Sequence, residues 1–113
     1  MPSLERWKAT WPELGVPITA ALLSAYDDLI ARYCEPHRKY HTVRHLDECF
    51  TKLEEIRALA ERPGEVEAAL WFHDAIYETR SSQNEAKSAD LAAEVVRNAG
   101  KPSDSVERIS DLI

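Results

Sequence analysis

The sequence predicts an all-α fold, and two observations carry this prediction. Apolar residues recur with the three-to-four-residue spacing of helices over most of the 113-residue chain. These stretches are separated by proline and glycine, and no alternating run is long enough to predict a β-strand. The length is that of one domain, so residues 1–113 are expected to form a single bundle of five to six helices.

The first two expected helices end where proline and glycine follow them. A short helix is expected over residues 3–11, before Pro12 and Gly15, and the core helices then occupy residues 17–113. The second helix starts near residue 17 and ends before Pro36, since the residue preceding a proline disfavours the α conformation. Its apolar face comprises Leu22, Tyr26, Leu29, Ile30 and Tyr33.

The third expected helix begins at Thr42, which can cap its N-terminus, and continues to the break at residues 62–64. Its inward face comprises Leu46, Phe50, Leu53 and Ile56. The fourth helix is expected over residues 65–78. One inward stripe is predicted for it, consisting of Val66, Ala69, Leu70, His73, Ile76 and Tyr77.

The fifth expected helix covers residues 83–99 and ends at Gly100, which suits a left-handed C-cap. A sixth opens at residues 102–103, where Asp104 and Glu107 have the spacing of a capping box. It stops at the end of the chain after barely two turns, which predicts a truncated bundle. Apolar surface would then remain on this helix and favour a homodimer through Ile109, Leu112 and Ile113.

Composition narrows the possible functions. The net charge of -6 argues against a generic surface for a nucleic-acid polymer or an anionic membrane, and no basic recognition helix indicates a helix-turn-helix protein. No apolar stretch approaches a membrane span, and the N-terminus lacks an apolar signal core, so a cytoplasmic location is expected. Cys34 and Cys49 do not form a CxxC pair and are predicted to be reduced core thiols.

Three of the four histidines lie in the runs RKYHTVRH (38–45) and WFHDAIYE (71–78). His73 is the polar member of the stripe predicted for the fourth helix, and Asp74 follows it. A buried imidazole beside a carboxylate must be hydrogen-bonded, ion-paired or bound to a metal. Both a satisfied core histidine and a metal ligand fit this pattern.

His41 and His45 are four residues apart, so on a helix they would share one side, as in helical zinc sites with this spacing. His41 lies at or before the expected helix start, however, and its ring can therefore point in another direction. The alternative interpretation is a solvated basic loop. The metal interpretation gains weight only when this run is combined with the second one.

The ordered segments CEPHRKYHTVRHLDECF, ALWFHDAIYE and NEAKSA resemble the HD superfamily of metal-dependent phosphohydrolases, and within it a small bacterial branch. The resemblance covers residues 20–113. It implies an HD-type helical bundle with a divalent metal ion (Mn, Fe, Ni, Co, Zn or Mg) in its central cleft. It also implies hydrolysis of a small, nucleotide-like phosphomonoester or phosphodiester.

The resemblance assigns His45, His73 and Asp74 as metal ligands. Two imidazoles and a carboxylate suit such an ion and leave positions for substrate and for a water that the metal activates. The related cyclic-nucleotide phosphodiesterases have a proton-donating histidine four residues before the first ligand. His41 occupies that position, although Thr42 replaces their asparagine. The expected catalytic residues are therefore His41, Asp74 and Glu85.

Glu85 has two interpretations. It lies on one face with Ala89, Ala92 and Val96, so its carboxylate can point toward His45 or the water. Ser82 and Glu85 also have the spacing of a capping box, however.

Further expectations concern the residues around the site. Asn84 and Ser88 match the family's NE-and-serine run and are candidates to support the ligands. Substrate phosphate is expected to be oriented by Arg38, Lys39 and Arg44, although a solvated face suits at least one of them.

One departure from the family pattern leaves a second function open. The superfamily's fourth ligand is an aspartate on a later helix, and neither Asp104 nor Asp111 sits in its sequence context. A chain with an incomplete ligand set could retain its HD residues as a buried polar network. It would then be a non-catalytic helical module that works by association.

Overall fold

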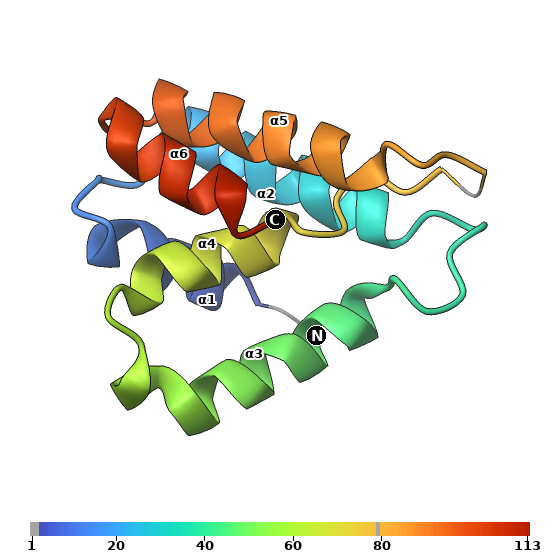
Figure 1. Ribbon diagram of the computed structural model, residues 1–113, viewed down its shortest axis with the longest axis horizontal. Helices are drawn as coiled ribbons and strands as arrows, with labels where there is room; N and C mark the ends of the chain where they lie inside the picture. Colours follow the sequence, from blue (N-terminus) through green and yellow to red (C-terminus); the bar gives the residue numbers. More distant parts are fainter. Residues whose placement is uncertain (1–2, 79) are drawn as a thin grey trace.

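The computed structural model describes residues 3–78 and 80–113, which fold as a bundle of helices (Figure 1). Across these residues there is no β-strand, and the prediction of an all-α fold is confirmed. Within the described part of the chain, no helix combines the length and the apolar character needed to cross a membrane. The elements are α1 (Leu4–Glu13), α2 (Ala20–Tyr33), α3 (Val43–Ile56), the 3₁₀-helix η1 (Arg57–Leu59), α4 (Pro63–Phe72), α5 (Asn84–Asn98) and α6 (Ser103–Asp111).

Helix α4 is the central helix and packs against α1, α3, α5 and α6 (Figure 1). A helix with neighbours on several sides needs apolar residues around most of its circumference rather than along one stripe. Accordingly, Ala68, Trp71 and Phe72 are almost completely buried, whereas Val66 and Leu70 are only half-buried. The single inward stripe predicted for this helix is therefore wrong.

Three tryptophans form the centre of the core. Trp7 makes edge-to-face contacts with Trp11 and Trp71, both with ring centroids 5.1 Å apart. Each such pair contributes about 0.5–1.5 kcal/mol beyond the burial of apolar area. The indole N–H groups of Trp7 and Trp71 donate to the Leu22 carbonyl (2.7 Å) and the Thr10 hydroxyl (3.2 Å). These bonds fasten α1 to both α2 and α4.

Glycine ends two helices where the sequence predicted an end. Gly15 has φ of +82° and Gly100 has φ of +102°, a region that disfavours residues with a Cβ. Helix α1 nevertheless includes Pro12 in its last turn and reaches Glu13, two residues beyond the expected end. Helix α2 ends at Tyr33, before Pro36 as predicted, but starts only after its N-cap Thr19.

Helix α3 starts after Thr42 as predicted, whereas other boundaries differ. It stops at Ile56 and gives way to η1, so it does not reach residue 62. Helix α4 stops at Phe72, six residues before the expected end at 78. The capping box at Asp104 is also wrong: Pro102 is the N-cap, and Asp104 lies inside the helix with a carboxylate oxygen 3.6 Å from Arg108.

Helix α6 buries more apolar surface than the sequence indicated. Ile109 is completely buried in the core, which contradicts the prediction that it would be exposed. Leu112 is 55% exposed, and Ile113 packs against the core. The Arg108 guanidinium binds both carboxylate oxygens of Glu65 at 2.8 Å, which ties α6 to the start of α4. A homodimer through this helix stays a prediction.

The two cysteines occupy different environments. Cys34 is the exposed C-cap of α2, so the prediction of a core thiol is wrong at this position. Cys49 lies on α3 and is half-buried. Both are free thiols.

Candidate metal centre

The site is built where α4 ends, and hydrogen bonds from outside the helix explain why it ends there. The last carbonyls of a helix lack partners within it. The His73 ring Nδ1 donates to the Leu70 carbonyl (2.7 Å), and the Tyr33 hydroxyl donates to that of Trp71 (3.0 Å). The same Tyr33 oxygen accepts the Asp74 N–H at 3.2 Å. His73 and Asp74 therefore lie in a turn, not in the helix expected for them.

Arg38 joins this turn to the loop before α3. Its side chain is fully buried, and its guanidinium donates to the main-chain carbonyls of His41 (2.9 Å), Asp74 (2.6 Å) and Ala75 (2.7 Å). The remaining donors bind Glu35 at 3.0 Å. Because every donor is engaged away from solvent, the prediction that Arg38 binds substrate phosphate is wrong.

The structure brings three imidazoles to one carboxylate oxygen. Oδ2 of Asp74 lies 2.8 Å from His41 Nδ1, 3.2 Å from His73 Nε2 and 3.6 Å from His45 Nε2. His41 comes from the loop before α3 and His45 from the first turn of α3, roughly 30 residues before the turn that carries His73 and Asp74. Among the described residues, the donor atoms of His41, His45 and Asp74 form one group that could hold a metal ion.

The charges of Asp74 and His73 are coupled. Burial would raise the pKa of Asp74, but hydrogen bonds from His73 and His41 outweigh it and hold that pKa well below its usual range. Burial would lower the pKa of His73, yet its bonds to Asp74 and to the Leu70 carbonyl raise it. The carboxylate is thus ionised at neutral pH. Since Nδ1 of His73 is committed to Leu70, its Nε2 is the atom presented to the site.

Cys49 is a site residue that sequence reasoning missed. It lies one turn after His45 on α3, and its Sγ is 3.8 Å from His45 Nε2. The donor atoms of His45, Cys49 and His73 form a second group able to hold a metal ion. Burial, together with the charges of Asp74 and Glu48, raises the pKa of the Cys49 thiol. The four-residue spacing between His45 and Cys49 was the available signal.

Helix α5 and the loop before α3 hold the chain that follows Asp74. The buried Ser88 hydroxyl accepts the N–H of Ile76 at 3.0 Å, and the Asn84 side chain bonds both main-chain groups of Glu78 at 3.0 and 3.1 Å. Opposite them, His37 Nε2 donates to the Tyr77 carbonyl at 2.6 Å. Asn84 and Ser88 thus support the backbone of the turn instead of contacting the expected ligands.

A cavity of about 230 Å³ opens beside His73 and Asp74. Glu85 lines it and is exposed, so its side chain does not lie in the core. The alternative role of Glu85 in a capping box is wrong, since α5 starts after Gln83 without a side-chain cap. The other walls are apolar and consist of Val66, Ala69, Leu70, Leu112 and Ile113. The C-terminal end of α6 lies by the end of α4 in Figure 1, which agrees with this lining.

A second cavity, of about 390 Å³, lies beside His45. Lys39 and Arg44 line it, and both are exposed, with 89% of the Arg44 side chain accessible. Arg44 approaches Glu48 at 3.6 Å, a surface pair of little strength. Both cations are therefore accessible to an anion near His45, and their role in orienting substrate phosphate stays a prediction.

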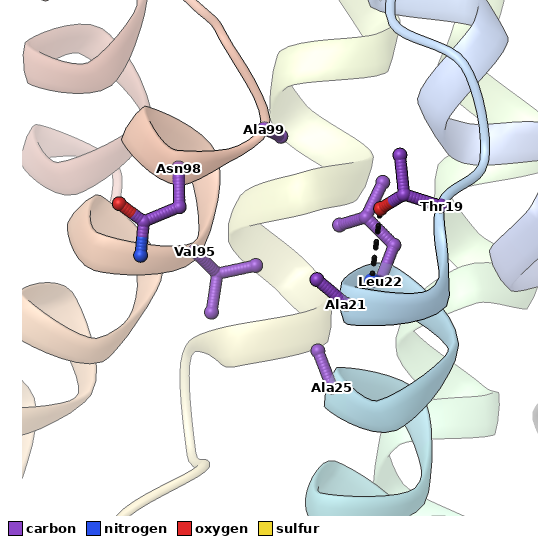
Figure 2. A pocket seen from close by; sticks show the side chains of 7 residues that line it. All are labelled: Thr19, Ala21, Leu22, Ala25, Val95, Asn98 and Ala99. Carbon is purple, nitrogen blue, oxygen red and sulfur yellow. Dashed lines mark hydrogen bonds between the residues drawn. The ribbon is translucent and has the colours of Figure 1, made fainter.

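A third cavity, of about 110 Å³, lies between the start of α2 and the end of α5, remote from the histidines (Figure 2). The side chains that line it are small and mostly apolar. The hydroxyl of Thr19 is already used as the N-cap acceptor for Leu22 N–H at 3.2 Å, the dashed line in Figure 2. With Asn98 as its other polar side chain, this cavity holds no group suited to acid–base or metal chemistry.

No protein-family model, curated protein or solved structure matches this chain. Function is therefore inferred from the side chains and their geometry. Imidazole nitrogens, a carboxylate and a thiol are the donors that first-row divalent ions prefer. The donor atoms present fit such an ion in type and in spacing, because those of each group lie within 4.8 Å of one another.

Proposed function

We propose that this chain is a metal-dependent phosphohydrolase of the HD type. The observation that carries the proposal is the convergence of His41, His45 and His73 on one oxygen of Asp74, within 2.8–3.6 Å. In the proposed site, His45, His73 and Asp74 hold a divalent ion. When bound, such an ion lowers the pKa of a coordinated water toward neutrality and stabilises charge on a phosphoryl oxygen.

His41 has the role of proton donor to the leaving oxygen. Its Nδ1 is engaged by Asp74 at 2.8 Å, which fixes the ring and leaves Nε2 for proton transfer. Its side chain is 37% exposed, so a substrate can reach it. Histidine is the side chain used most often for general acid catalysis.

The proposed substrate is a small phosphomonoester or phosphodiester of nucleotide-like size. Exposed Lys39 and Arg44 beside His45 supply positive charge for a phosphate, although the chain as a whole carries -6. The cavity they line, about 390 Å³, lies in the range of small-molecule sites. Glu85, in the neighbouring cavity, can accept a hydrogen bond from a water beside Asp74.

The test is elemental analysis of the chain purified without chelator, beside Asp74→Ala and the exposed control Asp90→Ala. We expect near-stoichiometric metal in the wild type and in Asp90→Ala and its loss in Asp74→Ala. A screen of phosphomonoesters and phosphodiesters with the metal-loaded chain then tests hydrolysis. The proposal is abandoned if the wild type binds no first-row divalent ion even when soaked with excess ion.

One observation favours a second candidate function, a non-catalytic association module. Asp74 accepts hydrogen bonds from His41 and His73, and the second nitrogen of His73 has its own acceptor in Leu70. These residues can therefore act as a closed polar network that shapes the end of α4. A metal-loaded chain without hydrolytic activity, together with a dimer in solution, would favour this module.

A further inference from the structure

Cys49 lies beside His45 and His73, and a thiol that only fills space in the core does not require such neighbours. It lies on α3 one turn after His45, so both side chains leave the same side of the helix. Its Sγ is 3.8 Å from His45 Nε2, and His73 reaches the same place from the end of α4. Cys34, the other cysteine, is exposed on α2 and belongs to neither metal-binding group.

Three of the separations between donor atoms are close to those around a single tetrahedral ion. Bond lengths of roughly 2.0–2.3 Å to zinc place two ligand atoms about 3.3–3.6 Å apart at the tetrahedral angle. The observed distances from His45 Nε2 are 3.8 Å to the Cys49 sulfur and 3.6 Å to the Asp74 oxygen. His73 Nε2 lies 3.2 Å from the same oxygen. One ion can therefore contact His45, Cys49 and His73, whose donor atoms lie within 4.8 Å of one another, and Asp74 is the candidate fourth donor because its Oδ2 approaches both histidines.

We propose that Cys49 is a ligand of this ion, which gives a donor set of His45, Cys49, His73 and Asp74. The inference rests on the metal site of the proposed function and adds to it the class of metal. A thiolate favours zinc, or cobalt in its place, over magnesium and manganese. It also adds a fourth protein donor to His45, His73 and Asp74. With four protein donors, a reacting water would have to enter as a fifth ligand, which some zinc sites accept in the transition state.

Co²⁺ added to the metal-free full-length chain tests this ligand directly, because thiolate bonded to Co²⁺ produces a near-ultraviolet charge-transfer band that imidazole and carboxylate do not. We expect this band in the wild type and in the control variant Cys34→Ser. We expect Cys49→Ser to lose this band and to bind Co²⁺ at least about 10-fold more weakly. A loss of this size is typical even when the replaced residue only supports a metal ligand. Circular dichroism checks that Cys49→Ser is folded.

A second measurement does not depend on removing Cys49. In Cys34→Ser, whose single remaining thiol is Cys49, Zn²⁺ should slow alkylation of that thiol by at least about 10-fold, whereas Mg²⁺ should not. Unchanged alkylation in the presence of bound Zn²⁺ overturns the inference.

The outcomes separate the two proposals. Co²⁺ binding without a thiolate band excludes Cys49 as a ligand and leaves the metal site of the proposed function in place. A thiolate band in a chain that hydrolyses no phosphoester supports the ligand and overturns the phosphohydrolase. Failure of the wild type to bind Co²⁺ overturns both.

Discussion

The buried guanidinium of Arg38 donates a 2.6 Å hydrogen bond to the main-chain carbonyl of Asp74, 36 residues later in the chain. The same group holds the carbonyl of His41, so it fixes both segments that form the candidate metal centre. Arg38 is next to the histidines in the sequence, and it fixes the backbone of the site while its guanidinium is directed at main-chain carbonyls.

Arg38→Met should unfold more easily and lose metal affinity, because three carbonyls lose their buried donor. Each buried group left without a partner costs about 1–3 kcal/mol, so the free energy of unfolding should fall by at least about 3 kcal/mol. Urea denaturation measures it. The exposed neighbour provides the control: Lys39→Met should change stability by less than about 0.5 kcal/mol. Equal stability of the two variants would contradict the role given to Arg38.

Tyr33→Phe should weaken the turn that carries Asp74. The substitution keeps the ring in the core but removes the hydroxyl that bonds the Trp71 carbonyl and the Asp74 N–H. We expect a loss of about 1–3 kcal/mol in the free energy of unfolding and weaker metal binding, measured by denaturation and by metal titration. Tyr40→Phe, at a side chain that is 81% exposed, is the matched control and should change neither.

His41→Ala and Asp74→Ala should separate proton transfer from metal binding. Asp74→Ala removes the oxygen on which the imidazoles converge and should abolish metal retention. His41→Ala should keep the metal and slow phosphoester hydrolysis by about 100-fold or more, the lower range of general acid contributions. Elemental analysis measures the metal content, and steady-state kinetics measure the rate of hydrolysis. Metal loss in His41→Ala would show that His41 is a ligand.

The Glu65–Arg108 pair should make the packing of α6 sensitive to acid. Hydrogen bonds from Arg108 are the largest influence on Glu65 and lower its pKa, against the opposing effect of burial. A depressed carboxyl pKa stabilises the fold fully above the unfolded value of about 4.3, and this contribution is lost as pH falls through the folded value.

Thermal melts at pH 7 and at progressively lower pH measure this contribution. Glu65→Gln should melt below the wild type at pH 7, and the gap should close as the pH falls below about 4. Asp104→Asn, which removes a 75% exposed carboxylate 3.6 Å from Arg108, should have little effect at either pH. A gap that stays constant with pH would contradict the role of the Glu65 charge.

The parts of the fold that follow from local chemistry could be predicted from the sequence. Pro36 and the positive-φ positions of Gly15 and Gly100 govern the backbone next to them, so the ends of α1, α2 and α5 were placed within about two residues. The end of α4 could not be placed in this way. Its last carbonyls are taken by Tyr33, from a different helix, and by a turn whose backbone Arg38 holds.

In the candidate site, too, some features follow from the local sequence and others depend on how the helices pack. The runs around His45 and His73 indicated a shared site, and the structure does bring their rings beside Asp74. A run of basic residues is normally solvated, so nothing local distinguished the buried Arg38 from the exposed Arg44. The four-residue spacing between His45 and Cys49 can be read from the sequence. The approach of Cys49 to His73 cannot, because it depends on how α3 packs against α4.

The two halves of the candidate centre lie at the start of α3 and just past the end of α4, with the whole of α3, η1 and α4 between them. An ion held by both halves would close a loop of roughly 30 residues, in the manner of a cross-link. Binding would therefore slow hydrogen exchange of the amides in α3 more than in α2, which contributes no donor atom to either group. The metal content of a preparation would then determine how readily about a quarter of the chain, from α3 to α4, unfolds locally.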